Sequence, residues 1–153
     1  MDAQMQKMGS SSGSADDALK ESIASLDEMV NAGDDRLVDD EFFDDVRDEL
    51  GLLHARFRAH AATDMFGAAR NASEDFPPEL SYELERLRSE HQHILGQLDW
   101  LARRVESIAQ RTLEDKDVFI LRGRELIAVL NRHIAEEDRL FYLALWCDTG
   151  GEG

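Results

Sequence analysis

Apolar residues recur at helical spacing along four stretches of the chain. Three long stretches, about residues 40–70, 79–110 and 112–147, carry apolar residues at heptad positions. A shorter first stretch has four apolar residues at intervals of three and four, namely Leu19, Ile23, Leu26 and Val30. No stretch alternates with the period of two that is typical of a strand. We therefore predict an all-α fold, and the short connections favour an antiparallel up-down-up-down four-helix bundle.

Segments that lack this periodicity set the expected limits of the domain. Residues 1–14 are rich in Gly, Ser and other polar residues, so we expect a disordered tail there. The Pro77-Pro78 pair breaks the chain between the second and third helices, because proline cannot continue a helix. The bundle is expected to span residues 15–147, followed by a flexible tail at residues 148–153.

Histidines and carboxylates interrupt three of the apolar stripes. The second helix carries His60 and Asp64 on its inner face, the third carries His91, and the fourth carries His133 and Glu137. Imidazole and carboxylate groups are costly in an apolar seam unless another group satisfies them. A bound metal would satisfy all five.

The distances of these residues from the interhelical turns place them in one layer of the bundle. His60 and His91 lie about 15 and 16 residues from the turn near residue 75, and His91 and His133 lie about 20 and 21 residues from the turn near residue 112. Equal numbers of residues give equal heights because each residue adds the same rise. The set therefore predicts a metal site, and the alternative is a hydrogen-bonded network of histidine and acid without metal.

The ligand types narrow the choice of metal. Imidazole and carboxylate in a helical bundle suit iron, manganese or zinc, and two carboxylates that bridge suit a dinuclear pair. His54 and His93 fall off the seams, so we expect them at the surface or beside the site. Glu136 faces about 100° away from Glu137, which favours a solvent or supporting role.

Composition excludes several other functions. The formal net charge of −16 argues against nucleic acid, whose phosphates attract basic residues. No apolar run reaches the roughly 20 residues of a membrane span, and no secretory leader is apparent. Cys147 is the single cysteine, which excludes a disulfide framework. We expect a cytoplasmic protein without membrane or nucleic-acid partners.

The same residues resemble the hemerythrin-like, HHE cation-binding family. The stretch HIAEEDRLF that begins at His133 is very similar to the signature of the family's fourth helix, and this motif is specific on its own. The stretch SEH that ends at His91 resembles its third helix. His60 and Asp64 resemble the pair on its second helix, with aspartate where glutamate is more frequent. The resemblance covers about residues 15–147.

This resemblance implies a non-haem di-iron site bridged by Asp64 and Glu137, with an oxygen-derived bridge or an open position for dioxygen or related small molecules. The sequence departs from the family in the first helix, where a histidine is expected. Lys20 or Ser22 stands at that place. Water, Glu21 or a solvent opening could replace the missing imidazole, or the second metal could be absent. The iron held by His60 is therefore expected to lack an imidazole.

The height of the first helix leads to the same expectation. We count residues back from the turn between the first and second helices. If this connector is short, residue 10 lies at about the level of His60, and if it is longer, residue 16 does. Neither position holds a histidine.

Three functions are compatible with these features. The first is a binding or sensing protein for dioxygen, or a protein that handles iron. The second is an enzyme that uses the open metal position on peroxide, dioxygen or nitric oxide. The third is a structural or interaction bundle with a degenerate site, in which Lys20 supplies a positive charge.

Overall fold

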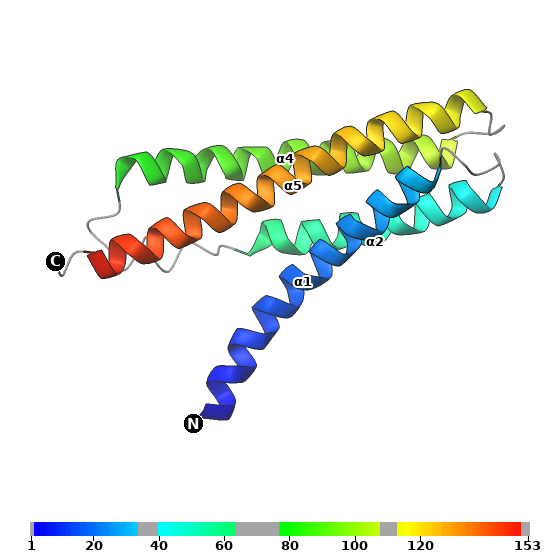
Figure 1. Cartoon of the computed structure of the whole chain (residues 1–153). Coiled ribbons are helices and arrows are strands. Elements are labelled where there is room, and N and C mark those ends of the chain that lie inside the picture. The colour runs from blue at the N-terminus through cyan, green and yellow to red at the C-terminus, as the bar shows by residue number, and fades with distance from the viewer. Residues whose placement is uncertain (1, 34–39, 64–76, 108–112, 151–153) are drawn as a thin grey trace.

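The computed structural model describes residues 2–33, 40–63, 77–107 and 113–150, and these residues form helices without any strand. The elements are α1 (Asp2–Ala32), α2 (Asp40–Ala62), α4 (Pro78–Ser107) and α5 (Leu113–Gly150) (Figure 1). The predicted all-α fold is confirmed. No described helix has the length and apolarity needed to cross a bilayer.

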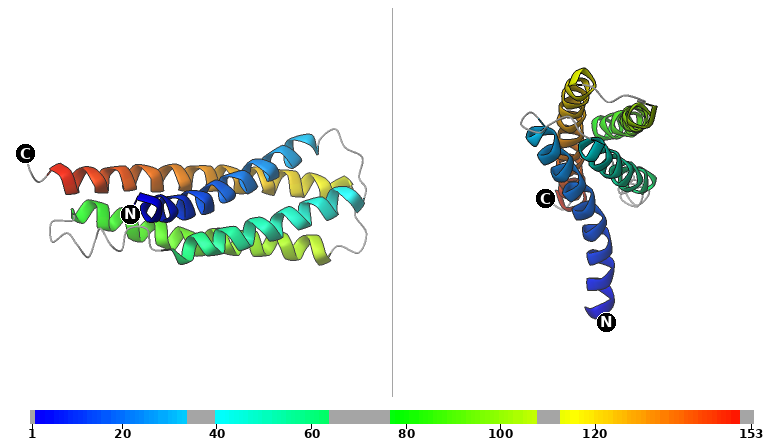
Figure 2. Two further views of the ribbon diagram at one scale, coloured as in Figure 1. Left: turned by 90° about the horizontal axis from the view of Figure 1, so that it is seen from below. Right: turned by 90° about the vertical axis from the view of Figure 1, so that its right-hand side faces the viewer.

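The helices surround a common core. Each packs against two neighbours in the order α1, α2, α4, α5 and back to α1, which is consistent with the predicted up-down arrangement (Figure 2). Most of the buried apolar side chains are those of the heptad stripes, and Phe42, Ile120 and Ile127 are buried in addition. Phe43 packs edge-on against Phe42 and Phe119. The core exists because each amphipathic helix removes its apolar stripe from water.

Both ends of the described chain differ from expectation. α1 begins at Asp2, so a helix occupies most of the segment predicted to be a disordered tail, and its first turns project away from the bundle (Figures 1 and 2). Extending an existing helix is far easier than nucleating one, and no proline interrupts residues 2–14. α5 likewise continues to Gly150, through part of the predicted flexible tail. Residues 151–153 lie outside the described part.

The first residues of α2 and α4 agree with the sequence pattern. α2 begins at Asp40 and α4 begins at Pro78, where the ring of proline is compatible with the first turn. α2 ends at Ala62, about eight residues before the end predicted near residue 70, and Thr63 is described but not helical. The predicted end of the third helix, near residue 110, lies outside the described residues.

Gly123 allows α5 to approach α1 closely. A Cβ atom at this position would lie 2.9 Å from Cγ2 of Val30. Val30 is buried, and a β-branched side chain has little rotational freedom in a helix. The glycine in the stripe of α5 is therefore required by packing between the two helices.

We expect the Gly123→Leu variant to lose about 1–3 kcal/mol of unfolding free energy, because the added side chain forces the helices apart. Gly51→Leu is the matched control: no atom lies within 4 Å of a Cβ there, and leucine is the better helix former. Urea unfolding followed by circular dichroism measures both. Equal stability of the two variants would contradict the close approach.

Candidate metal centre

The structure brings together four of the five residues that the register placed in one layer. His60 comes from α2, His91 from α4, and His133 and Glu137 from α5. One nitrogen or oxygen atom from each lies within 4.8 Å of the others. The imidazole centroids are 4.7–6.3 Å apart. The fifth predicted ligand, Asp64, lies outside the described residues.

A single carboxylate oxygen forms the centre of the cluster. Oε1 of Glu137 lies 2.9 Å from Nε2 of His60 and 3.4 Å from Nε2 of His91, and it also contacts Nε2 of His133. All three histidines therefore direct the same ring nitrogen toward one point. The ring of Phe57 packs against each imidazole, with centroids 5.6–5.9 Å apart, and closes the apolar side of the site.

Two further carboxylates lie beside Nδ1 of two imidazoles, on the side of the ring away from the centre of the cluster. Glu90 Oε1 lies 3.3 Å from Nδ1 of His133, and Asp16 Oδ1 lies 3.6 Å from Nδ1 of His60. A carboxylate beside Nδ1 favours the proton on that nitrogen and leaves Nε2 available as a ligand. The sequence pattern did not indicate Asp16 or Glu90 as residues that contact the site. However, counting residues back from the turn with a longer connector had placed residue 16 at the level of His60. The contact between Asp16 and His60 supports that count.

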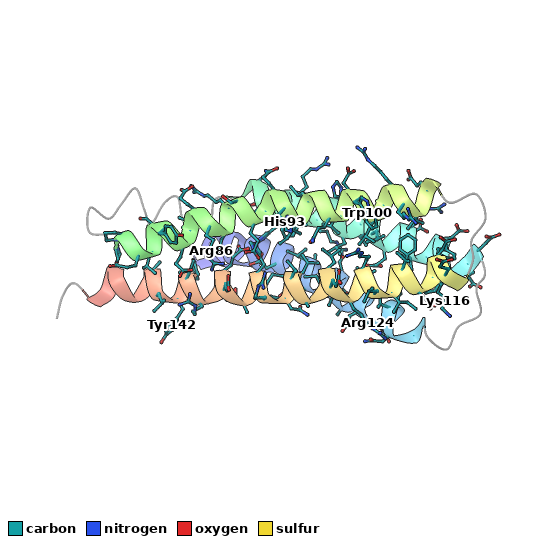
Figure 3. All side chains as sticks on the ribbon, turned by 90° about the horizontal axis from the view of Figure 1, so that it is seen from above. Arg86, His93, Trp100, Lys116, Arg124 and Tyr142 are labelled. Carbon is teal, nitrogen blue, oxygen red and sulfur yellow. The ribbon has the colours of Figure 1, made fainter. Side chains whose placement is uncertain are left out.

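Arginines surround Glu90 and join α4 to α5. Arg86 and Arg132 each lie 3.8 Å from an oxygen of Glu90, and Arg86 also donates a 2.8 Å hydrogen bond to Glu136 (Figure 3). Glu136 thus faces away from the cluster and supports the helix pair. The arginines neutralise carboxylates that would otherwise repel one another beside Glu137.

The candidates from the first helix do not reach the cluster. Ser22 is buried, but it accepts a hydrogen bond from Arg56. Glu21 is exposed. Lys20 lies 3.7 Å from Asp138, and both of these side chains are more than half exposed. Among the side chains of α1 that the structure describes, Asp16 makes the polar contact with the cluster, on the Nδ1 side of His60.

A small pocket opens beside His60 on the α1 side. Asp16, Lys20, His60, Glu137 and Asp138 are among its lining residues, and it has a volume of about 10 Å³. That volume is close to the minimum for one water molecule. Any group that enters from this side must be very small unless α1 moves.

The residues present fit a metal ion. Neither ring nitrogen of the fully buried His133 makes a hydrogen bond of regular geometry, although a carboxylate oxygen lies beside each. Coordination to an ion would give Nε2 a partner of regular geometry. Ligands about 2.1 Å from one ion are at most about 4.2 Å apart, and the four atoms lie within 4.8 Å of one another. Oε1 of Glu137 now occupies the point on which the imidazoles converge, so the carboxylate would move outward to admit an ion.

Burial and the imidazoles act in opposite directions on the acid–base properties of the cluster. Burial alone would raise the pKa of Glu137, but His133, His60 and His91 together hold that pKa well below its ordinary value of 4.5. Burial alone would lower the pKa of His60, whereas Glu137 and Asp16 outweigh burial and raise it above 6.5. Without metal, the cluster therefore favours an ionised Glu137 next to a protonated His60.

In the metal-free protein, we expect the contribution of this cluster to the free energy of unfolding to be largest between about pH 4.5 and 6.5. The ionised Glu137 stabilises the fold above 4.5, and this contribution is lost as the pH falls toward the lowered pKa. The protonated His60 stabilises it below 6.5, and that contribution is lost as the pH rises through the raised pKa.

Urea midpoints measured across this range in the presence of a chelator give the profile. Glu137→Gln keeps the shape of the side chain. In this variant the urea midpoint should fall less than in the unaltered protein, both as the pH drops below 4.5 and as it rises above 6.5. A variant whose profile runs parallel to that of the unaltered protein would show that the cluster does not cause the dependence.

Comparison of the chain with protein-family models, with curated proteins and with solved structures gives no match.

Proposed function

We propose that this protein is a metal-binding protein of the hemerythrin-like kind, with a non-haem iron centre that binds dioxygen or a similarly small molecule. The observation that supports this most directly is the convergence of three imidazole nitrogens and one carboxylate oxygen within 4.8 Å at the centre of a helical bundle. The resemblance of the α4 and α5 motifs to the family favours iron over zinc or manganese.

The described ligands are sufficient for one ion. His60, His91 and His133 offer Nε2 atoms, and Glu137 offers Oε1, which is a set of four donors. A second ion requires Asp64 as a bridge and further ligands on the side of His60. Because α1 supplies no imidazole there, we propose two unequal positions, of which the one on the α1 side holds its iron more weakly.

The bound iron would supply redox chemistry and an open coordination position. The protein contributes the surroundings. Phe57 and the burial of His133 exclude water from the inner side of the site. The small pocket bounded by Asp16 and Lys20 restricts what approaches from α1 to molecules about the size of water or dioxygen.

Metal analysis of protein purified without added metal tests the proposal. We expect iron, with a visible absorption band from an oxygen-derived ligand, and a chelator should remove the more weakly held iron first. Removal of both irons in one step would contradict the unequal positions. Purified protein that contains no metal, and that takes up none from added Fe²⁺, Mn²⁺ or Zn²⁺, would overturn the proposed function as a whole.

We expect Glu90→Gln to weaken metal binding by about 10- to 100-fold, the usual effect of losing a carboxylate that orients a ligand histidine. The amide keeps the size of the side chain but not the charge beside Nδ1 of His133. Glu85→Gln on the same helix is the control, because Glu85 pairs with Arg88 outside the cluster. Competition with a chromophoric chelator measures the affinities, and equal affinity in both variants would show that Glu90 has no part in positioning His133.

A further inference from the structure

A second and much larger pocket lies between α4 and α5, away from the metal cluster. Its volume is about 510 Å³, which is within the usual range of roughly 300–1,000 Å³ for small-molecule sites. Residues 92–101 of α4 and residues 122–126 of α5 provide its walls. Figure 3 looks onto these two helices and shows His93 and Trp100 along α4.

The walls combine an apolar base with one large aromatic ring. Leu101 and Leu126 are almost completely buried, and both line the pocket. The indole of Trp100 is 46% exposed, although it is one of the largest apolar side chains of the protein. The guanidinium of Arg104 lies 5.9 Å from the centroid of that indole ring and helps to fix its position. A flat ligand could stack on the indole and cover apolar surface that water now contacts.

The polar groups of the walls indicate a ligand without net charge. Arg122 and Glu125 form a 3.0 Å ion pair at the pocket, so the two charges cancel. Gln97 also lines the pocket, and its Oε1 is shielded from solvent and accepts no hydrogen bond. The terminal amide rotates easily about its last torsion, so a donor inside the pocket could satisfy this oxygen.

Gly96 keeps the α4 wall open. No atom lies within 4 Å of a Cβ built at this position, and a larger residue would place its side chain in the pocket. Glycine is a poor helix former, so its presence in the middle of α4 is not explained by helix stability.

We propose that this pocket binds a small, planar, uncharged heteroaromatic molecule that stacks on Trp100 and donates a hydrogen bond to Gln97. The proposal is independent of the metal, because the volume, the ion pair and the shielded amide oxygen all lie outside the cluster.

Lumichrome is a suitable probe, since it is planar and uncharged and carries ring N–H donors. Its fluorescence is titrated with the full-length protein, both in chelator and after loading with metal. A dissociation constant on the order of 0.1 mM is expected for about 18 non-hydrogen atoms at ordinary ligand efficiency. Binding should be similar with and without metal.

Gly96→Leu should weaken lumichrome binding by at least about 10-fold by filling the pocket, a loss of about 1.4 kcal/mol. Gly51→Leu is the matched control, because it also replaces an open helical glycine but lies on α2. Both variants should unfold at a temperature no lower than that of the unaltered protein, because leucine is the better helix former, and their metal content should remain unchanged. Equal binding by the two variants, whether retained or lost, would overturn the proposal.

Gln97→Met tests the hydrogen bond separately. We expect about 2- to 10-fold weaker binding of lumichrome, the usual net value of one hydrogen bond, and no change for an N-alkylated lumichrome that has no ring N–H donor. An equal effect on both probes would exclude the hydrogen bond. An anionic apolar dye is the probe for charge selectivity. If the dye binds and Gly96→Leu abolishes this binding, the pocket does not prefer an uncharged ligand.

Discussion

The His133→Ala variant is expected to lose most of its bound metal. His133 is completely buried, and its Nε2 contacts the carboxylate of Glu137 at the centre of the cluster. The substitution removes one of three imidazoles from a four-atom site, and no other described side chain of the cluster can take its place. Metal per chain, measured by elemental analysis after dialysis, should fall to a small fraction of that in the unaltered protein.

His54→Ala is the matched control, because His54 lies on α2 only six residues from His60 but outside the cluster. Its metal content should equal that of the unaltered protein. Circular dichroism of both variants establishes that the helices are retained. If folded His133→Ala protein kept the full amount of metal, the cluster would not be the metal site.

Saturation with metal is expected to raise the melting temperature by roughly 5–10 °C. A ligand present at about 100 times its dissociation constant stabilises a folded protein by about 2.7 kcal/mol. Each kcal/mol raises the melting temperature of a domain of this size by about 2–4 °C. The bundle should respond in this way because the ligands come from α2, α4 and α5, so an ion joins three helices.

Thermal scans with added Fe²⁺ under anaerobic conditions, or with Zn²⁺, measure the shift. The shift should disappear in Glu137→Ala, which removes the oxygen that faces all three imidazoles, and remain in Glu136→Ala, whose carboxylate binds Arg86. A similar shift in both variants would indicate that the metal binds to the acidic surface instead.

The sequence pattern was sufficient to predict the helical class and the layer of the site. The rise per residue of a helix is constant, so residue counts from the turns placed His60, His91 and His133 at one height. The spacing of four residues placed Glu137 on the same face as His133. The sequence pattern did not predict the helix over residues 2–14, because composition describes average polarity and the extension of α1 depends on an existing helix.

The role of the first helix could be predicted only in part. The missing histidine is visible in the sequence, and the height count reached residue 16. The family resemblance indicated Lys20, Glu21 and Ser22 as candidates. The structure places Lys20 beside Asp138, Glu21 at the surface and Ser22 beside Arg56. Side-chain direction depends on how α1 is rotated about its axis, and periodicity defines that rotation less closely than it defines height.

Four amphipathic helices, the apolar faces that form the core, and a layer of imidazoles and carboxylates within it could all be predicted from the amino-acid sequence. These features depend on local geometry, which repeats along every helix. Tertiary structure alone decided that Asp16 and Glu90 support His60 and His133, that Arg86 joins Glu136 to α4, and that a pocket remains between α4 and α5. Contacts between helices depend on their rotation and crossing angles, which are set by how all the side chains pack together.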